Sequence, residues 1–289
     1  MSGFHRKERD TLNEVPLTKD VAEFARQARI EAAKMLNRTN DSHIGGGYSS
    51  MDILAVLYQK ILKLTPENLD DPNRNIFLLS KGHIAASHYA VLALSGLIPR
   101  ADLALHVADG SFYAGHTRKF QTSGVRGVEM SAGSLGHGAS VGAGMAYAKR
   151  LQGLLGNVYV LMGDGECNEG SVWEAAMFAA KFQLSNFVMI IDRNRLQSYG
   201  SDKEVLDMGD LAAKFASFGC QVMEIDGHDY DAIYRSLSTA VSRNPAKPAV
   251  IVAHTVKGKG ASFMENRLEW HFKSPNDEQL LQILEEQKA

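Results

Sequence analysis

The hydrophobic residues of this chain follow two spacings, one helical and one typical of strands. Helical spacing covers residues 21–36 and 51–62, and the second of these segments follows a glycine-rich turn at 45–47. A short apolar run at 76–79 is bounded by polar residues, which indicates a strand, and the loop after it starts another helix. We therefore expect helices at the beginning of the chain and the first strand near residue 76.

From residue 141 onward, helix and strand patterns alternate. Such alternation implies crossover connections. We therefore predict an α/β fold with a mostly parallel sheet, helices on both faces, and ligands at the carboxyl ends of the strands. The predicted helices run from 141 to about 151 and cover 172–182, 211–218, 230–241 and 278–288. The predicted strands cover 158–162, 188–191, 221–225 and 249–254.

The segment from residue 110 to residue 138 shows little periodicity and is rich in glycine and serine. It is longer than most connections within a compact domain. Long irregular segments often carry function, so we predict a binding loop here.

Composition narrows the class of protein. With 289 residues, 45% hydrophobic and 22% charged, the chain is typical of globular proteins, and we expect one domain over 1–289 with a helical extension at 1–40 and a tail at 272–289. A net charge of −2 without a basic block argues against nucleic acid. No signal peptide or spanning segment is evident, so we expect a cytoplasmic protein without a membrane partner, with Cys167 and Cys220 as buried thiols.

Two of the predicted strands lead into polar motifs. Strand 158–162 runs into Gly163-Asp164-Gly165-Glu166, and strand 188–191 leads to Asn194, thirty residues after Asp164. Neighbouring parallel strands would bring these side-chain oxygens to one point, where a hard cation such as Mg²⁺ finds the ligands it prefers. The glycines and the following helix N-terminus would let a phosphate approach the backbone. We predict a cation that bridges the protein to a diphosphate.

A Gly-Asp-Gly turn alone is common, but its pairing with Asn194 resembles the fingerprint of thiamine-diphosphate proteins, and specifically of transketolases. The resemblance covers about residues 22–275. Arg193 replaces the first of two asparagines, and Phe272 stands where glycine usually follows the last histidine. Further matching segments are Ser42-His43-Ile44-Gly45-Gly46, Ser80-Lys81-Gly82-His83, Ala114-Gly115-His116, Gly133-Ser134-Leu135-Gly136-His137-Gly138 and Trp270-His271.

The resemblance implies roles for the matching residues. The metal, Mg²⁺ or else Ca²⁺ or Mn²⁺, would be held by Asp164, Asn194 and the main-chain carbonyl of Leu196. Histidine exchanges protons near working pH, and the catalytic residues would be His43, His83, His116 and His271. Glu169 and Glu174 would communicate between active sites. Thiamine diphosphate would contact His83, Gly133, Leu135, Gly163, Asp164, Gly165, Glu166, Asn194 and His271.

The other histidines lack a glycine-bearing loop at a strand end, and a lone histidine is more often a surface or core residue than a catalyst. We interpret His5, His88, His106, His228 and His254 as structural. A dinucleotide site is disfavoured, because no G-x-G-x-x-G motif follows an early strand.

The implied activity is that of a transketolase, which moves a two-carbon ketol unit from a ketose phosphate to an aldose phosphate. In that family a glutamate on a second, pyrimidine-binding domain activates the cofactor, yet only 18 residues follow His271. Either the sequence is a fragment or, as we expect, a second subunit carries that domain and its glutamate in an α2β2 assembly. The alternatives are a relative of 1-deoxyxylulose-phosphate synthase or of the 2-oxo-acid dehydrogenase α chain, or a non-catalytic relative.

Overall fold

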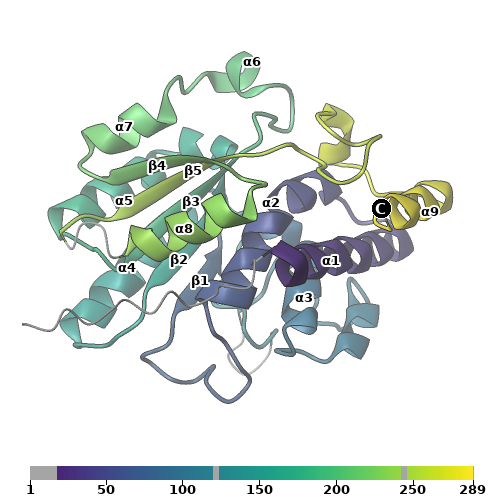
Figure 1. Ribbon diagram of the computed structural model, residues 1–289, viewed down its shortest axis with the longest axis horizontal. Coiled ribbons are helices and arrows are strands. Elements are labelled where there is room, and N and C mark those ends of the chain that lie inside the picture. Colours follow the sequence, from purple (N-terminus) through teal and green to yellow (C-terminus); the bar gives the residue numbers. More distant parts are fainter. Residues whose placement is uncertain (1–17, 120–123, 242–245, 289) are drawn as a thin grey trace, which may run out of the picture.

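A five-stranded β-sheet forms the centre of the computed structural model, which describes residues 18–119, 124–241 and 246–288. Its strands follow the spatial order β1-β2-β3-β5-β4, and every neighbouring pair is parallel (Figure 1). The predicted parallel α/β sheet is therefore confirmed. The strands are β1 (Ile76–Leu79), β2 (Val158–Gly163), β3 (Phe187–Arg193), β4 (Gln221–Asp226) and β5 (Ala249–His254).

Both faces of the sheet are buried, because successive strand residues pack into two different apolar clusters. On β2, Val158 and Val160 belong to one cluster, and Tyr159 and Leu161 belong to the other. Helices α4, α5 and α7 cover the first face, and α8 covers the second beside α2, against which α1 and α3 pack (Figure 1).

The order of the elements follows the predicted alternation closely. The α-helices are α1 (Thr18–Thr39), α2 (Ile44–Val56), α3 (Ala85–Leu94), α4 (His137–Leu151), α5 (Gly170–Lys181), α6 (Asp202–Leu206), α7 (Leu211–Ser217), α8 (Tyr230–Ala240) and α9 (Asp277–Glu286). A π-helical turn at Leu57–Ile61 continues α2, and 3₁₀ turns cover Gly82–Ile84, Arg100–Leu105, Asp164–Asn168 and Leu268–His271.

The glycine run at 45–47 lies inside a helix, so the predicted turn and the predicted helix start at residue 51 are wrong. Helix α2 begins at Ile44, directly after His43 in a left-handed conformation with φ 74°. A Cβ atom on Gly47 would lie 2.1 Å from Ser87 Oγ, and one on Gly45 would lie 2.9 Å from the Trp270 carbonyl oxygen. Each glycine destabilises the helix by about 1 kcal/mol relative to alanine, and the close packing that only glycine permits offsets this cost.

Smaller differences concern the ends of elements. Helix α4 starts at His137 rather than near residue 141, so the predicted binding loop ends at Gly136, which has φ 78°. Strand β3 extends to Arg193, which makes Asp192 a strand residue. Residues 1–17 of the predicted N-terminal extension and residues 120–123 of the predicted loop lie outside the described residues.

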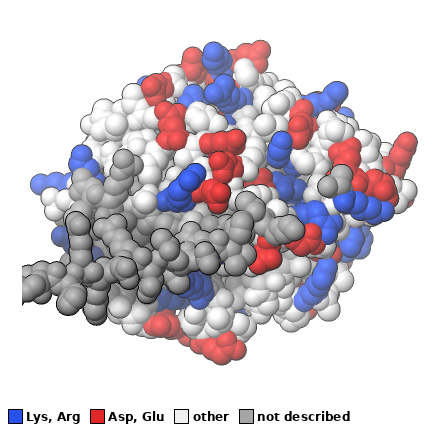
Figure 2. Space-filling view, in the orientation of Figure 1, with Lys and Arg blue, Asp and Glu red and all other residues white. Residues whose placement is uncertain are grey.

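The charged side chains on one face of the molecule are mixed in sign (Figure 2). Acidic and basic side chains are interspersed on the face shown in Figure 2, consistent with the net charge of −2. Among the described residues, no helix has the length and apolar character needed to cross a bilayer. Cys167 and Cys220 are free and buried, as predicted.

Candidate active site

A cavity of about 390 Å³ opens at the carboxyl-end edge of the sheet, where parallel sheets bind their ligands. Its walls come from the start of α2, the loops after β1, β2, β3 and β5, and the 268–271 turn. Every residue assigned to the site from the sequence lines this cavity: His43, His83, His116, Gly133, Leu135, Gly163, Asp164, Gly165, Glu166, Asn194, Leu196 and His271.

The carboxyl group of Asp164 lies buried just beyond the tip of β2. Its oxygens accept hydrogen bonds from the main-chain N–H groups of Gly165 (2.9 Å) and Arg195 (2.6 Å). Burial and the nearby carboxylate of Asp192 raise the pKa of Asp164 to about 6. The ionised form is therefore unfavourable as it stands, and a bound cation would stabilise it.

The amide of Asn194 is held in one orientation at the tip of the neighbouring strand β3, as the spacing predicted. Its Nδ2 donates to Asp192 Oδ2 (3.2 Å), and its Oδ1 accepts from the Leu196 N–H (3.1 Å). Arg195 between them has φ 63°, in the left-handed region, and this turn of the chain brings its N–H to Asp164. The amide oxygen is thereby directed away from Asp192.

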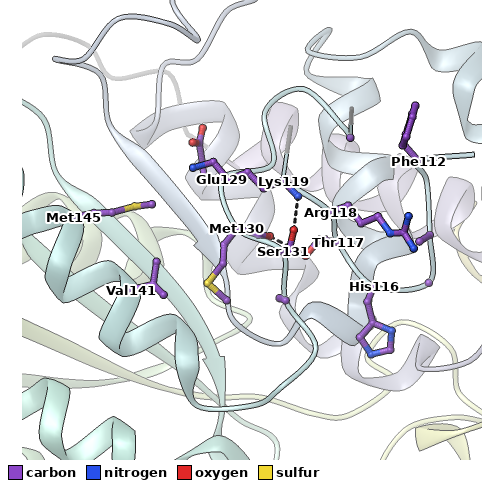
Figure 3. A pocket seen from close by; sticks show the side chains of 14 residues that line it. Phe112, His116, Thr117, Arg118, Lys119, Glu129, Met130, Ser131, Val141 and Met145 are labelled. Atoms are coloured by element: carbon purple, nitrogen blue, oxygen red, sulfur yellow. Dashed lines mark hydrogen bonds between the residues drawn. The ribbon is translucent and has the colours of Figure 1, made fainter. Parts of the chain in front are cut away.

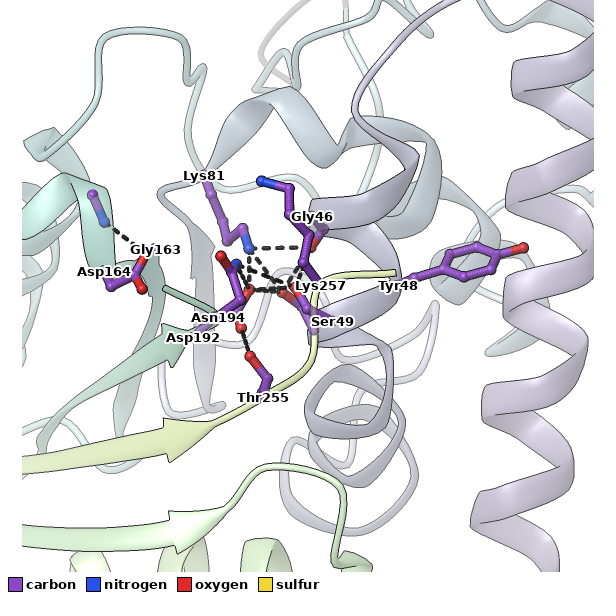
Figure 4. Close-up of polar contacts among 12 residues, drawn as sticks. Gly46, Tyr48, Ser49, Lys81, Gly163, Asp164, Asp192, Asn194, Thr255 and Lys257 are labelled. Atoms are coloured by element: carbon purple, nitrogen blue, oxygen red, sulfur yellow. Dashed lines mark hydrogen bonds and ion pairs between the residues drawn. The ribbon is translucent and has the colours of Figure 1, made fainter. Parts of the chain in front are cut away.

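Asp192 gathers the polar groups beneath these residues, as Figure 4 shows. Its carboxylate accepts hydrogen bonds from Ser49 Oγ (2.7 Å) and from Lys81 Nζ, and Thr255 and Ser50 donate to it as well. Burial alone would raise its pKa, but the Lys81 ammonium and these donors lower the pKa of Asp192 to about 2. Asp192 therefore stays ionised and anchors both Asn194 and Lys81.

Lys81 and Lys257, which were not predicted as site residues from the sequence, also line the cavity. Lys257 Nζ donates to the Leu196 carbonyl (3.0 Å) and to His271 Nδ1 (2.7 Å), both of them uncharged partners. Burial and the charge of Lys81 lower the pKa of Lys257 to about 8. Lys81 and Lys257 each lie beside a glycine in a loop after a strand, a signal that could have found them.

The candidate catalytic histidines form one cluster. The ring centroid of His43 lies 4.9 Å from that of His83, 5.5 Å from that of His271 and 6.3 Å from that of His116. Burial, with smaller effects of neighbouring His116 and Lys257 respectively, lowers the pKa of His43 to about 4 and that of His271 to about 3. Neutral rings at neutral pH have one donor and one acceptor each, which suits binding to sugar hydroxyls.

These residues fit a hard divalent cation. Asp164, Asn194 and Leu196 offer carboxylate, amide and carbonyl oxygens, and each of these oxygens accepts a single hydrogen bond, which leaves a lone pair for a metal. In the described part of the chain, no group of three or more His, Cys, Asp or Glu side chains is placed to hold a metal ion. The candidate ligand set therefore depends on amide and carbonyl oxygens.

They also fit a diphosphate. The buried ammonium of Lys257 has no carboxylate of the described residues within ion-pair distance, so an anion in the cavity would stabilise it. A Cβ atom on Gly163 would meet nothing within 4 Å, which leaves open space beside the main chain. A site suited to a cation and a site suited to an anion thus lie side by side in this cavity.

Glu166 connects the tip of β2 to the glycine-rich loop. Its carboxylate accepts from Ser80 Oγ (2.5 Å), from the Gly136 N–H (2.8 Å) and from the Gly163 N–H (2.9 Å), and burial raises its pKa. These bonds place Gly133 and Leu135 at the cavity wall.

A wider hollow of about 830 Å³ adjoins the site, and His116 lines both spaces. Figure 3 shows its mixed lining, which includes the charged side chains of Arg118, Lys119 and Glu129 and the apolar side chains of Met130, Val141 and Met145.

The two glutamates assigned a role in communication, and those histidines interpreted as structural that the structure describes, do not line the cavity. Glu169 and Glu174 are exposed and do not line it, so their predicted role in communication stays a prediction. His88 and His106 are buried elsewhere, and His254 contacts Glu224. His5 falls outside the described residues.

Fold and site together define a thiamine-diphosphate-binding domain of the transketolase type. Residues 21–286 match the family described as "Transketolase, thiamine diphosphate binding domain", and the chain belongs to this family.

Similar proteins carry transketolase names. The chain is 38% identical to an apulose-4-phosphate transketolase subunit from Actinobacillus succinogenes, over 96% of this chain and 99% of that protein. It is 36% identical to a 6-deoxy-6-sulfo-D-fructose transketolase subunit from Clostridium sp., over 87% and 90%. The crystal structure of Campylobacter jejuni transketolase superposes with a TM-score of 0.86 at 31% identity, covering 93% of this chain but 42% of the longer one.

Proposed function

We propose that this chain is one subunit of a thiamine-diphosphate-dependent transketolase that transfers a two-carbon ketol unit from a ketose phosphate to an aldose phosphate. In this proposal Asp164, Asn194 and the Leu196 carbonyl hold Mg²⁺, and Lys257, His83 and Gly165 face the diphosphate. The cofactor supplies the nucleophilic carbon and stores the electron pair of the transferred unit. The observation that carries the proposal is the convergence of a buried carboxylate, a buried lysine and the histidine cluster in one cavity.

The histidines bind and orient the sugar. His43, His116 and His271 present neutral or exposed ring nitrogens to the cavity, where they can donate to or accept from sugar hydroxyls. Ser42 Oγ contacts His43 Nδ1 (2.7 Å), and Ser198 Oγ contacts His271 Nε2 (3.1 Å), so two of these rings have fixed orientations. Fixed rings place a proton donor or acceptor at a defined position relative to the substrate.

A second subunit completes the proposed site in an α2β2 assembly. The names of the relatives support this step, because two of them are called subunits and match this chain in length. Apolar side chains at the rim of the cavity add to it: Leu135, Tyr199 and Val205 are 38%, 88% and 40% exposed. A partner that carries the pyrimidine-binding domain and the activating glutamate would cover them.

Calorimetry and product analysis test the proposal. The chain is titrated with thiamine diphosphate in the presence of Mg²⁺, alone and together with the pyrimidine-binding chain encoded in the same genome. We expect saturable, Mg²⁺-dependent binding, and transfer from xylulose 5-phosphate or another ketose phosphate only when both chains are present. Turnover of pyruvate instead would indicate a synthase or a dehydrogenase, and absence of cofactor binding in both samples would indicate a non-catalytic relative.

A further inference from the structure

His228, in the turn between β4 and α8, lies outside the cavity but is bonded at both ring nitrogens. Its Nδ1 lies 2.7 Å from Asp52 Oδ2, and its Nε2 accepts a hydrogen bond from the Val256 N–H at 2.8 Å. An N–H donor at Nε2 requires that this nitrogen carry no proton, so the ring proton is on Nδ1 and is donated to Asp52. The ring therefore links Asp52 to the main chain after β5.

Asp52 is itself held firmly. The Arg29 guanidinium donates to Asp52 Oδ2 (2.8 Å), and the Tyr230 hydroxyl donates to Oδ1 (2.9 Å). Asp52 and Arg29 are both buried. Although burial opposes it, the charge of Arg29 holds the pKa of Asp52 well below its ordinary value, so the acceptor for the His228 proton persists at neutral pH. The link from α1 and α2 to His228 is a fixed support.

Val256, which receives this support, lies between Thr255 and Lys257, and the side chains of both take part in the hydrogen bonds beside the cavity. Thr255 donates to Asp192, and Lys257 donates to the Leu196 carbonyl and to His271. On the far side of Lys257, the Gly258 N–H donates to the Gly45 carbonyl at 2.9 Å. The main chain that carries Lys257 is thus bonded at Val256 and Gly258, and His228 supplies the first of these bonds.

We infer that His228 is a positioning residue: its Nε2 fixes the main chain at Val256 and thereby aims Thr255 and Lys257 at the cavity. The inference rests on the proposed function, because Lys257 needs a defined position only if an anionic ligand binds beside it. His228 thus has a more specific role than the purely structural one expected from the sequence.

Two substitutions separate the two bonds of the ring. The amide oxygen of His228→Gln can take the place of Nε2 and accept from the Val256 N–H, whereas the amide nitrogen of His228→Asn can take the place of Nδ1 and reach only Asp52. Calorimetry with thiamine diphosphate and Mg²⁺ is performed on the full chain together with its partner. Loss of a group that holds a ligand-binding residue in place typically costs 10–100-fold in affinity. We therefore expect the affinity to fall about tenfold or more in His228→Asn and to stay near normal in His228→Gln.

A double-mutant cycle distinguishes positioning from general damage. In a Lys257→Met background, His228→Asn should cause a smaller loss of affinity than it does in the wild type, because one of the two side chains that His228 positions is gone. Equal losses in the Gln and Asn variants, or additive losses with Lys257→Met, would overturn the inference.

A second measurement needs no cofactor. Amide hydrogen exchange at Val256 in the isolated chain should be faster in His228→Asn than in the wild type, and close to the wild type in His228→Gln. Unchanged exchange in both variants would reject the positioning role. If wild-type protein binds no thiamine diphosphate but exchange follows the expected order, the proposed function fails while the support of Val256 stands.

Discussion

Asp164 shows how a single residue can be set up for a ligand at the expense of the unliganded fold. Its carboxyl group is buried, and its pKa is raised to about 6. Two main-chain N–H groups donate hydrogen bonds to it, but no cationic side chain of the described residues does. We expect Asp164→Ala to abolish Mg²⁺-dependent binding of thiamine diphosphate in calorimetry. The melting temperature should stay unchanged or rise, because the variant removes an unfavourable buried charge.

The matched control is Asp231→Ala, which changes the same residue type at an exposed position in the first turn of α8, outside the cavity. It should retain the wild-type affinity for thiamine diphosphate. Unchanged cofactor affinity in Asp164→Ala would count against the metal assignment.

We predict that Phe272 influences which sugars the assembled enzyme accepts. Its ring is 55% exposed, and its centroid lies 4.7 Å from that of His271 and 5.8 Å from that of His43. This exposed ring thus lies next to two of the histidines that are proposed to bind the sugar. We expect Phe272→Gly to change the ratio of kcat/KM between a branched and a linear ketose phosphate by about tenfold, a typical effect of reshaping a pocket wall.

Phe272→Tyr keeps the ring and should keep the wild-type ratio. The comparison is made with the two-subunit enzyme and both donors in parallel assays. An unaltered ratio in Phe272→Gly would show that the ring does not contribute to donor choice.

At the scale of the element, Gly142 allows α4 to pack closely against the sheet. A Cβ atom on Gly142 would lie 2.5 Å from Val160 Cγ2 and 2.8 Å from Phe187 Cε2, whereas one on Gly144 would meet nothing within 4 Å. Gly142→Ala should therefore lower the free energy of unfolding by about 1–3 kcal/mol through overpacking. Gly144→Ala should raise it by about 0.5–1 kcal/mol, because alanine favours a helix.

Urea unfolding of the isolated chain measures both variants. Equal effects of the two substitutions would mean that α4 can shift on the sheet without cost. The N-terminus of α4 carries the Gly133–Gly138 segment, so we also expect the cofactor affinity of the assembled enzyme to fall in Gly142→Ala alone.

At the scale of the whole molecule, buried neutral histidines govern stability in acid. Burial lowers the pKa of His88 to about 3, and similar effects act on His43 and His271. The unfolded chain takes up these protons near pH 6.5, whereas the folded chain resists them. Stability is therefore fully present above pH 6.5 and is lost as the pH falls toward the folded-state values.

His88 isolates this effect, because it lies outside the cavity and packs against Tyr58 and Phe77. A fully buried neutral histidine such as His88 contributes about 1.4 kcal/mol per pH unit to the slope within that window. Between pH 6 and pH 4 we expect the free energy of unfolding to fall less steeply with decreasing pH in His88→Gln than in the wild type, by about 1.4 kcal/mol per pH unit. Parallel pH profiles for the variant and the wild type would contradict the prediction that buried His88 lowers stability in acid.

The local pattern of residues was sufficient to predict the sheet and the tips of its strands. Alternating apolar segments determine where strands such as β2 and β3 form, and a parallel sheet places Asp164 and Asn194 at one edge. The histidines were assigned from their resemblance to the family's motifs, and of the four only His83 and His116 follow a glycine directly. The glycines near His43 are helical, and the 268–271 turn that carries His271 contains no glycine.

Only tertiary structure decided the features that depend on contacts between distant segments. Gly45 and Gly47 are needed in their helix because Trp270 and Ser87 approach them closely, and nothing near them in the sequence reveals that approach. Asp192 and Lys257 are ordinary strand and loop residues until burial and the charge of Lys81 shift their pKa values. Periodicity is local and can be seen along a chain, whereas burial and the pairing of charges arise only when the chain folds.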